Sequence, residues 1–226
     1  MNRMKPYQQY NTKSFTKGLV HFWPLDHLID IIGGKNLSVE PNVKFTSDRH
    51  DNTYSAIQFN NGYGEFPVNQ YLEPTGSTYM LWIKMLAYTT YQGILSFAKT
   101  LERLDANEIY IYLETGRLKL TRYENENQIY FISSNTLLPI GEWVHIAVTL
   151  DTNKVIAYIN SVEVGSFLSA SDSGETTYNY LGKNLGTKGT KANSVFDEVK
   201  IFNRILSVEE ITDEMNKQQP YDIMNC

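Results

Sequence analysis

The sequence contains almost no cysteine: Cys226 is the only one in 226 residues. One cysteine cannot form a disulfide within the chain, so a folded domain has to be stabilised by its apolar core. The sequence also lacks any apolar run near the roughly 18 residues that a membrane helix needs. The first 17 residues lack the apolar stretch of a signal peptide. We therefore expect no insertion into a membrane.

Basic residues are in deficit as well. The chain has 20 Lys and Arg against 25 Asp and Glu, a net charge of -5, which repels a phosphate backbone at long range. We therefore exclude nucleic acid as a partner. A hydrophobic content of 42% with 20% charged residues is typical of a chain that buries a core.

Common catalytic patterns are also missing. The sequence has no Gly-x-Ser-x-Gly elbow and no glycine spacing of a phosphate-binding loop or a dinucleotide-binding fold. The four histidines, His21, His27, His50 and His145, are scattered along the chain, which argues against a zinc site. His21 and His145 fall in expected strands, where we expect their ring nitrogens to have partners.

The sequence is rich in short segments in which apolar and polar residues alternate, and turn residues separate these segments. In residues 79–85 the odd-numbered side chains would face one side of a strand and enter the core. Residues 108–113 and 118–122 flank a turn that contains Gly116, and residues 142–150 and 155–160 flank a polar four-residue loop. A further turn at Asn160–Ser161 leads into residues 162–167, although Ser161 tolerates a positive φ poorly.

The end of the chain has the one segment with a helical pattern. Ser207 and Glu210 form a capping box, and Val208, Ile211 and Met215 lie on one helix face. The sequence thus predicts an all-β fold, a two-sheet antiparallel β-sandwich with one short C-terminal helix. We expect one domain over residues 18–217, a disordered or draped arm over 1–17 and a tail over 218–226. Residues 169–177 and 186–193 should be mobile surface loops around a short strand at 178–182.

Three segments carry a resemblance to a known superfamily. They are 18–26 (GLVHFWPLD), 141–149 (GEWVHIAVT) with the later Tyr158–Ile159–Asn160, and 196–207 (FDEVKIFNRILS) followed by Glu209–Glu210–Ile211. Together they resemble the first strand, central hairpin and closing strand and helix of the laminin G-like, concanavalin A-type jelly rolls, which include pentraxin-like lectins. Residues 27–30, the strand around Trp82 and the closing helix are also similar to the jelly-roll half of clostridial neurotoxin receptor-binding regions.

The resemblance implies a calcium ion in many members of the superfamily, and Asp26 and Asp197 are the matching positions for a structural site. Calcium prefers several oxygen ligands, including carboxylates. The segment 31–36 departs from the Asp-Ser-x-Gly-Asn that the superfamily usually has after its first strand. Calcium is therefore an expected but not a required cofactor.

The resemblance also covers enzymes that hydrolyse glycosides, and these need two carboxylates facing one cleft. The alternating Glu-x-Asp-x-Glu pattern of such members does not occur. The nearest acidic run, Glu102, Asp105 and Glu108, has a spacing of three beside Arg103 and is typical of a solvated face. We therefore expect no catalytic residue.

Ligand contact is best assigned to tyrosines in loops, because an exposed ring can stack on a sugar or anchor a protein partner. Tyr88 and Tyr91 are the first candidates, followed by Tyr63 and by Tyr178 with Asn184.

Three functions follow in order of preference. The first is a non-catalytic module that binds a glycan or protein surface through rim loops, and the second is a structural or adhesion domain of a larger surface or secreted protein. The third is a glycoside hydrolase-like enzyme. The first two imply an extracellular or cell-surface location, whereas the oligomeric state has no signature in the sequence.

Overall fold

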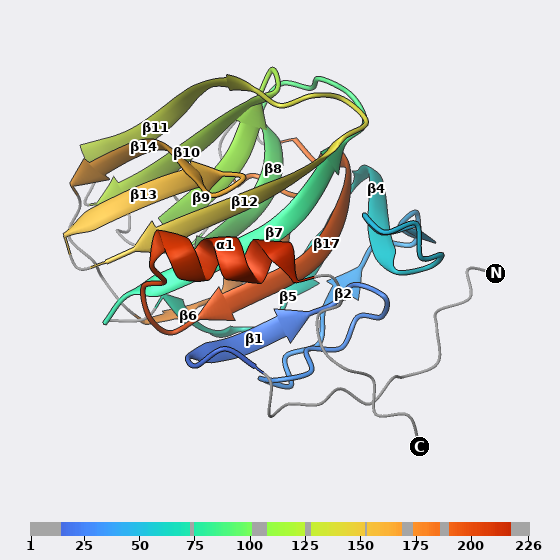
Figure 1. Ribbon diagram of the computed structural model, residues 1–226, viewed down its shortest axis with the longest axis horizontal. Helices are drawn as coiled ribbons and strands as arrows, with labels where there is room; N and C mark the ends of the chain where they lie inside the picture. The colour runs from blue at the N-terminus through green and yellow to red at the C-terminus, as the bar shows by residue number, and fades with distance from the viewer. Residues whose placement is uncertain are drawn as a thin grey trace.

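Two large antiparallel sheets pack face to face in the computed structural model (Figure 1). The structure describes residues 15–72, 75–100, 108–124, 128–151, 153–168, 174–185 and 190–217. Within these residues one helix, α1, follows the last strand. The predicted all-β sandwich with a short C-terminal helix is confirmed. No described helix is long and apolar enough to cross a membrane.

The first sheet has eight strands in the order β14-β13-β12-β7-β17-β4-β3, and β1 pairs with β17 beside this path. The strands are β1 (Leu19–Trp23), β3 (Lys44–Thr46), β4 (Ala56–Gly62), β7 (Ser77–Met85), β12 (Trp143–Leu150), β13 (Lys154–Ile159), β14 (Val162–Leu168) and β17 (Ala192–Phe202).

The second sheet has seven strands in the order β11-β10-β9-β8-β16-β5-β2. They are β2 (Ser38–Val39), β5 (Gly64–Phe66), β8 (Gln92–Ala98), β9 (Glu108–Glu114), β10 (Arg117–Glu124), β11 (Gln128–Leu137) and β16 (Tyr178–Leu181). A separate small pair joins β6 (Asn69–Leu72) to β15 (Gly174–Thr176).

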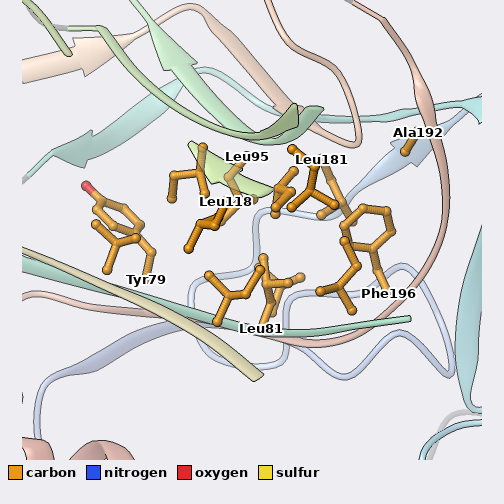
Figure 2. Close-up of a cluster of buried hydrophobic side chains, with 14 of the residues drawn as sticks. Tyr79, Leu81, Leu95, Leu118, Leu181, Ala192 and Phe196 are labelled. Atoms are coloured by element: carbon orange, nitrogen blue, oxygen red, sulfur yellow. The ribbon is translucent and has the colours of Figure 1, made fainter. Parts of the chain in front are cut away.

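The main core fills the space between the two sheets. Figure 2 shows Tyr79 and Leu81 of the first sheet close to Leu95, Leu118 and Leu181 of the second. Met80, which lies between the first two in sequence, belongs to a second apolar cluster on the other side of the sheet. The predicted alternation of β7 is therefore confirmed, and its second face is buried at Met80 and half-buried at Trp82 and Lys84.

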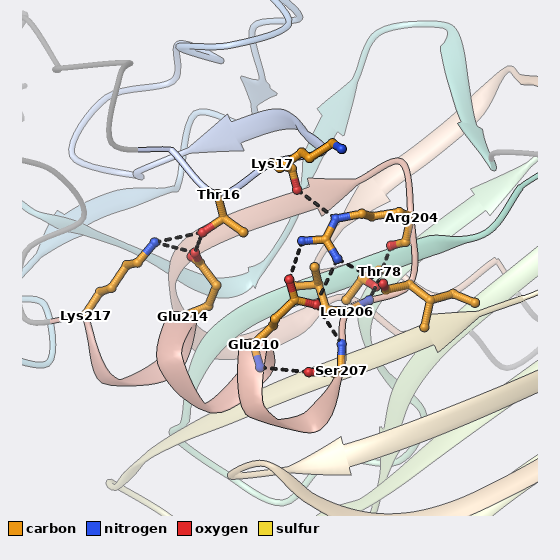
Figure 3. Close-up of polar contacts among 10 residues, drawn as sticks. Thr16, Lys17, Thr78, Arg204, Leu206, Ser207, Glu210, Glu214 and Lys217 are labelled. Atoms are coloured by element: carbon orange, nitrogen blue, oxygen red, sulfur yellow. Dashed lines mark hydrogen bonds and ion pairs between the residues drawn. The ribbon is translucent and has the colours of Figure 1, made fainter.

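Helix α1 (Val208–Asn216) lies across the outer face of the first sheet (Figure 1). Its predicted capping box is confirmed, since Ser207 accepts a hydrogen bond from the Glu210 backbone and the Glu210 side chain accepts one from the Ser207 backbone (Figure 3). The predicted apolar face is wrong in part: Val208 is 42% exposed, and the buried residues are Ile211 and Glu214.

The predicted hairpins form with the expected turns. Thr115 and Gly116 both have positive φ, as do Asn160 and Ser161, at 48° and 64°. Ser161 therefore takes the left-handed conformation despite its side chain, because the Asn160 side chain accepts a hydrogen bond from the His145 backbone and fixes the turn.

Two predicted loops differ from the sequence expectation, and several segments lie outside the described residues. The predicted loop 169–177 contains strand β15, and the predicted loop 186–193 overlaps the start of β17 at Ala192. Residues 1–14, 169–173, 186–189 and 218–226 are not among the described residues, so the predicted arm, tail and domain limits stay predictions.

Candidate binding site

Strand ends from both sheets meet at one rim of the sandwich. Neighbouring strands are antiparallel, so the end of one lies beside the start of the next. The ends that meet here are Met85 of β7, Gln92 of β8, Glu114 of β9, Leu181 of β16 and Ala192 of β17. Contacts link them: the Gly93 amide donates to the Thr190 carbonyl at 3.2 Å, and the Leu86 amide donates to the Asn193 carbonyl at 3.0 Å.

The connection between β16 and β17 crosses the outer side of β8 at this rim. A Cβ on Gly93 would lie 2.1 Å from the Lys183 carbonyl carbon, so only glycine permits this approach. The Ser96 hydroxyl donates to the Lys183 carbonyl oxygen at 2.7 Å, which fixes the crossing. Gly182, with φ of 81°, turns the chain out of β16 and brings Lys183 to the outer face.

Two tyrosine rings and one lysine form the centre of the site. The rings of Tyr63 and Tyr180 meet edge to face with centroids 5.4 Å apart. The Lys183 ammonium lies 4.1 Å from the Tyr180 centroid and 4.5 Å from the Tyr63 centroid. Both distances are within the range of a cation–π interaction.

A second lysine reaches the same ring. The Lys191 ammonium lies 4.9 Å from the Tyr63 centroid and 2.6 Å from a Glu40 carboxylate oxygen. Burial lowers the pKa of Lys183 and Lys191 lowers it further, whereas Glu65 and Glu40 act in the opposite direction.

Tyr91 and Tyr112 form a second aromatic pair beside the crossing segment. Their ring centroids are 6.1 Å apart, and the Tyr91 carbonyl accepts a hydrogen bond from the Thr190 amide at 3.4 Å. A hydrogen bond to Glu114 raises the pKa of Tyr91. Glu114 also pairs with Lys119 at 3.1 Å, so this pair of rings has a charged border. We call Tyr63, Tyr91, Tyr112, Tyr180, Lys183 and Lys191 together the tyrosine rim.

The structure places the other predicted site residues around the tyrosine rim. Tyr88 is 45% exposed, its hydroxyl donates to the Leu138 carbonyl at 3.1 Å, and its ring lies over Gly116. Tyr178 is half-buried at the far end of β16, two residues from Tyr180. Asn184, in the crossing segment, is only 7% exposed, and its backbone nitrogen lies against Gly93. Of the five predicted residues, Tyr63 and Tyr91 belong to the tyrosine rim, and both are half-buried.

Sequence reasoning missed Tyr112, Tyr180, Lys183 and Lys191. A signal existed for Tyr180, because Tyr178 and Tyr180 are two residues apart and share a strand face. The lysines had no such signal, since their place depends on where the connection between β16 and β17 crosses the sheet.

The predicted calcium ligands have other neighbours. Asp26 lies 3.5 Å from His27, and Asp197 lies 3.5 Å from the guanidinium of Arg49. Among the described residues, no three His, Cys, Asp or Glu side chains are grouped so that they could hold a metal ion. The Asp197 carboxylate thus faces a cation, the guanidinium of Arg49. Calcium binding at Asp26 and Asp197 stays a prediction.

One carboxylate has the raised pKa that catalytic acids often show. Burial and the neighbouring Glu198 raise the pKa of Asp197 well above its usual range. Both side chains, however, are only 4% exposed and pair with Arg49. A substrate has no access to a pair enclosed in this way. Of the acidic run considered above, residues 102 and 105 lie outside the described residues, and Glu108 begins β9.

The fold is shared with known binding domains. Domain 4 of AbnA, a GH43 extracellular arabinanase from Geobacillus stearothermophilus in complex with arabinotriose, is 19% identical, with a TM-score of 0.68 over 86% of this chain and 97% of that chain. The binding domain of Paraclostridial Mosquitocidal Protein 1 is 16% identical, with a TM-score of 0.69 over 88% of this chain and 52% of that chain.

The botulinum neurotoxin serotype D/C VPI 5993 binding domain is 14% identical, with a TM-score of 0.69 over 89% of this chain and 52% of that one. The chain thus spans about half the length of the toxin binding domains. These likenesses show the fold alone, and the comparison with curated proteins gives no match. A family model described as the concanavalin A-like lectin/glucanases superfamily, Laminin_G_3, matches residues 52–212. The resemblance seen in the sequence is therefore confirmed, and the chain belongs to the Laminin_G_3 family of the concanavalin A-like lectin/glucanases superfamily.

Proposed function

We propose that this domain is a non-catalytic module that binds a glycan at the tyrosine rim. The observation that carries the proposal is the convergence of half-exposed aromatic rings from separate segments of the chain. Tyr63 follows β4, Tyr91 precedes β8 and Tyr112 lies in β9. Flat aromatic rings beside polar groups are suited to the apolar faces and hydroxyls of sugar rings.

The solved relatives support binding rather than catalysis. The arabinanase domain, covered over 97% of its length, was solved with an arabinotriose. Two carboxylates at the tyrosine rim, Glu114 and Glu40, are each engaged by a lysine, which does not favour their use as the acid and base of a glycosidase. A sugar-binding role also supports the proposal that the domain acts outside the cell, within a longer protein.

The test is a glycan array followed by calorimetry with the purified chain. We expect binding to at least one oligosaccharide and a loss of roughly 10-fold or more in affinity for Tyr63→Ala and Tyr91→Ala, because a stacked ring contributes on the order of 1–2 kcal/mol at a contact.

The matched control is Tyr54→Ala. Tyr54 is 47% exposed and precedes β4, whereas Tyr63 follows it, so the two tyrosines lie at opposite ends of one strand. Loss of affinity in the Tyr54 variant alone, or unchanged affinity in both rim variants, would place the site elsewhere. If the chain binds a protein instead of a glycan and the rim variants, but not the Tyr54 variant, weaken that binding, the tyrosine rim remains the binding surface and the ligand is a protein.

A further inference from the structure

We propose that the glycan bound at the tyrosine rim carries a carboxylate, as in a uronic or sialic acid, and that Lys183 and Lys191 bind this group. This inference rests on the proposed function and names its ligand class. It starts from the placement of two cations side by side in a chain whose net charge is -5.

The two lysines are directly opposite each other. Lys183 and Lys191 form an antiparallel bridge, so their side chains leave the backbone on the same side. Both ammonium groups lie within 5 Å of the centroid of one ring, that of Tyr63, at 4.5 and 4.9 Å. Like charges directly opposite each other are destabilising, so this pair costs free energy unless an anion compensates it.

Among the described residues, only one of the two ammonium groups has such an anion. Lys191 pairs with Glu40 at 2.6 Å. In the part of the chain that the structure describes, Lys183 has no carboxylate oxygen within ion-pair distance, and its contacts are the two rings. The Glu65 carboxylate, on β5 opposite Tyr180, is exposed and lies outside that distance.

The surroundings make an added anion favourable. Burial makes the pKa of Lys183 lower than usual, which indicates that its charge is poorly solvated. A carboxylate placed between the two lysines would restore the lost solvation with charge-assisted hydrogen bonds. The backbone of Lys183 is fixed by Ser96 and by the approach to Gly93, so the ammonium is presented from a defined position. A sugar ring attached to that carboxylate would lie beside Tyr63.

The experiment compares acidic oligosaccharides with their own methyl esters, which keep the sugar scaffold and remove the charge. The probes are oligogalacturonate, oligoglucuronate and sialyllactose, and calorimetry with the whole chain measures each affinity. We expect at least one acid to bind about 10-fold or more tightly than its ester. We also expect Lys183→Met to remove this preference and Lys183→Arg to retain part of it.

Two further variants sharpen the test. Glu65→Gln should increase the affinity for the acid, because it removes a repelling carboxylate, and leave the ester unchanged. Lys44→Met, at an exposed lysine of β3 in the first sheet, should change neither. A melting curve for each variant separates loss of binding from loss of folding.

The possible results distinguish this inference from the proposed function. If esters or neutral array sugars bind at Tyr63 as tightly as the acids, the inference is overturned and the proposed function stands. If no sugar binds the folded chain, both are overturned. If the acid preference survives in the folded Lys183→Met variant, the carboxylate is bound elsewhere and the assignment of Lys183 is wrong.

Discussion

The outer faces of the two sheets use charged residues in opposite ways. On the first sheet, α1 covers the face, and the charges beneath it are buried and paired. Lys200 of β17 lies 2.9 Å from Glu214 of α1 and 3.3 Å from Glu198. Figure 3 shows Glu214 also contacting Thr16 and Lys217, which ties the start of the described chain to its end.

On the second sheet no described helix covers the outer face. Two lysines share one ring there, and within the described part of the chain only Lys191 has a carboxylate partner. The charge of a side chain therefore does not by itself indicate its role. A buried charge that has lost its water must be matched within the fold, so the covered face serves stability. A half-exposed charge without a partner can be matched by a ligand, so the uncovered face is suited to binding.

The largest expected effect comes from breaking the covered face. Glu214→Gln removes the nearer of the two carboxylates beside the buried Lys200, and we expect the free energy of unfolding to fall by about 3 kcal/mol, because a buried ion pair that loses one partner is strongly destabilised. Urea denaturation measures the loss. Asp213→Asn is the matched control, since Asp213 is the preceding, exposed residue of the same helix, and it should change stability by less than about 0.5 kcal/mol. Equal effects of the two variants would contradict the role of the buried pair.

The second effect concerns pH. Burial, together with Lys200 and Arg49, lowers the pKa of His145 to about 3, from 6.5 in the unfolded chain. Between these values the unfolded chain binds a proton that the folded chain does not. Stability therefore falls as the pH is lowered, by up to about 1.4 kcal/mol per pH unit.

His145→Phe keeps a ring against Trp82, where the centroids are 5.2 Å apart, and removes the titrating group. We expect the variant to lose stability less steeply than the natural chain between pH 6 and pH 5, as measured by urea denaturation at each pH. The raised pKa of Asp197 changes stability with pH in the opposite direction. Because Asp197 is present in both proteins, its contribution cancels in the difference between their stability curves. Parallel pH curves for the two proteins would show that His145 is not the group responsible.

The smallest expected effect is on the uncovered face. Lys183→Met keeps most of the apolar stem over Tyr63 and Tyr180 and removes a charge that burial disfavours. We expect the free energy of unfolding to change by less than about 0.5 kcal/mol, or to rise slightly, in a urea titration. A loss of 2 kcal/mol would mean that Lys183 stabilises the fold as Lys200 does, and the contrast between the two faces would disappear.

Local patterns in the sequence were sufficient for much of the architecture. The alternation in residues 79–85, the turn at Gly116 and the capping box of Ser207 and Glu210 are each set by neighbours in the chain, so they could be predicted. Tyr63 and Tyr91 could be proposed as contacts because both lie next to turn residues. His21 has the partners expected of it, Asp30 at 2.6 Å and Asn69 at 2.9 Å.

His145 shows where local reasoning ends. Its Nδ1 has no hydrogen-bond partner among the described residues, contrary to the prediction, because Trp82, Arg49 and α1 enclose it from elements distant in sequence. Glu214 is buried beside Lys200 of β17, a partner that no pattern within α1 indicates.

Residues close together in the chain were enough to predict several strands and turns and the cap of α1, and three short segments indicated the family. Contacts between distant segments set which sheet face α1 covers, which charges lose water and how Lys183 and Lys191 meet over one ring. Solvation and charge pairing depend on distances between segments far apart in sequence, and no local pattern encodes these distances.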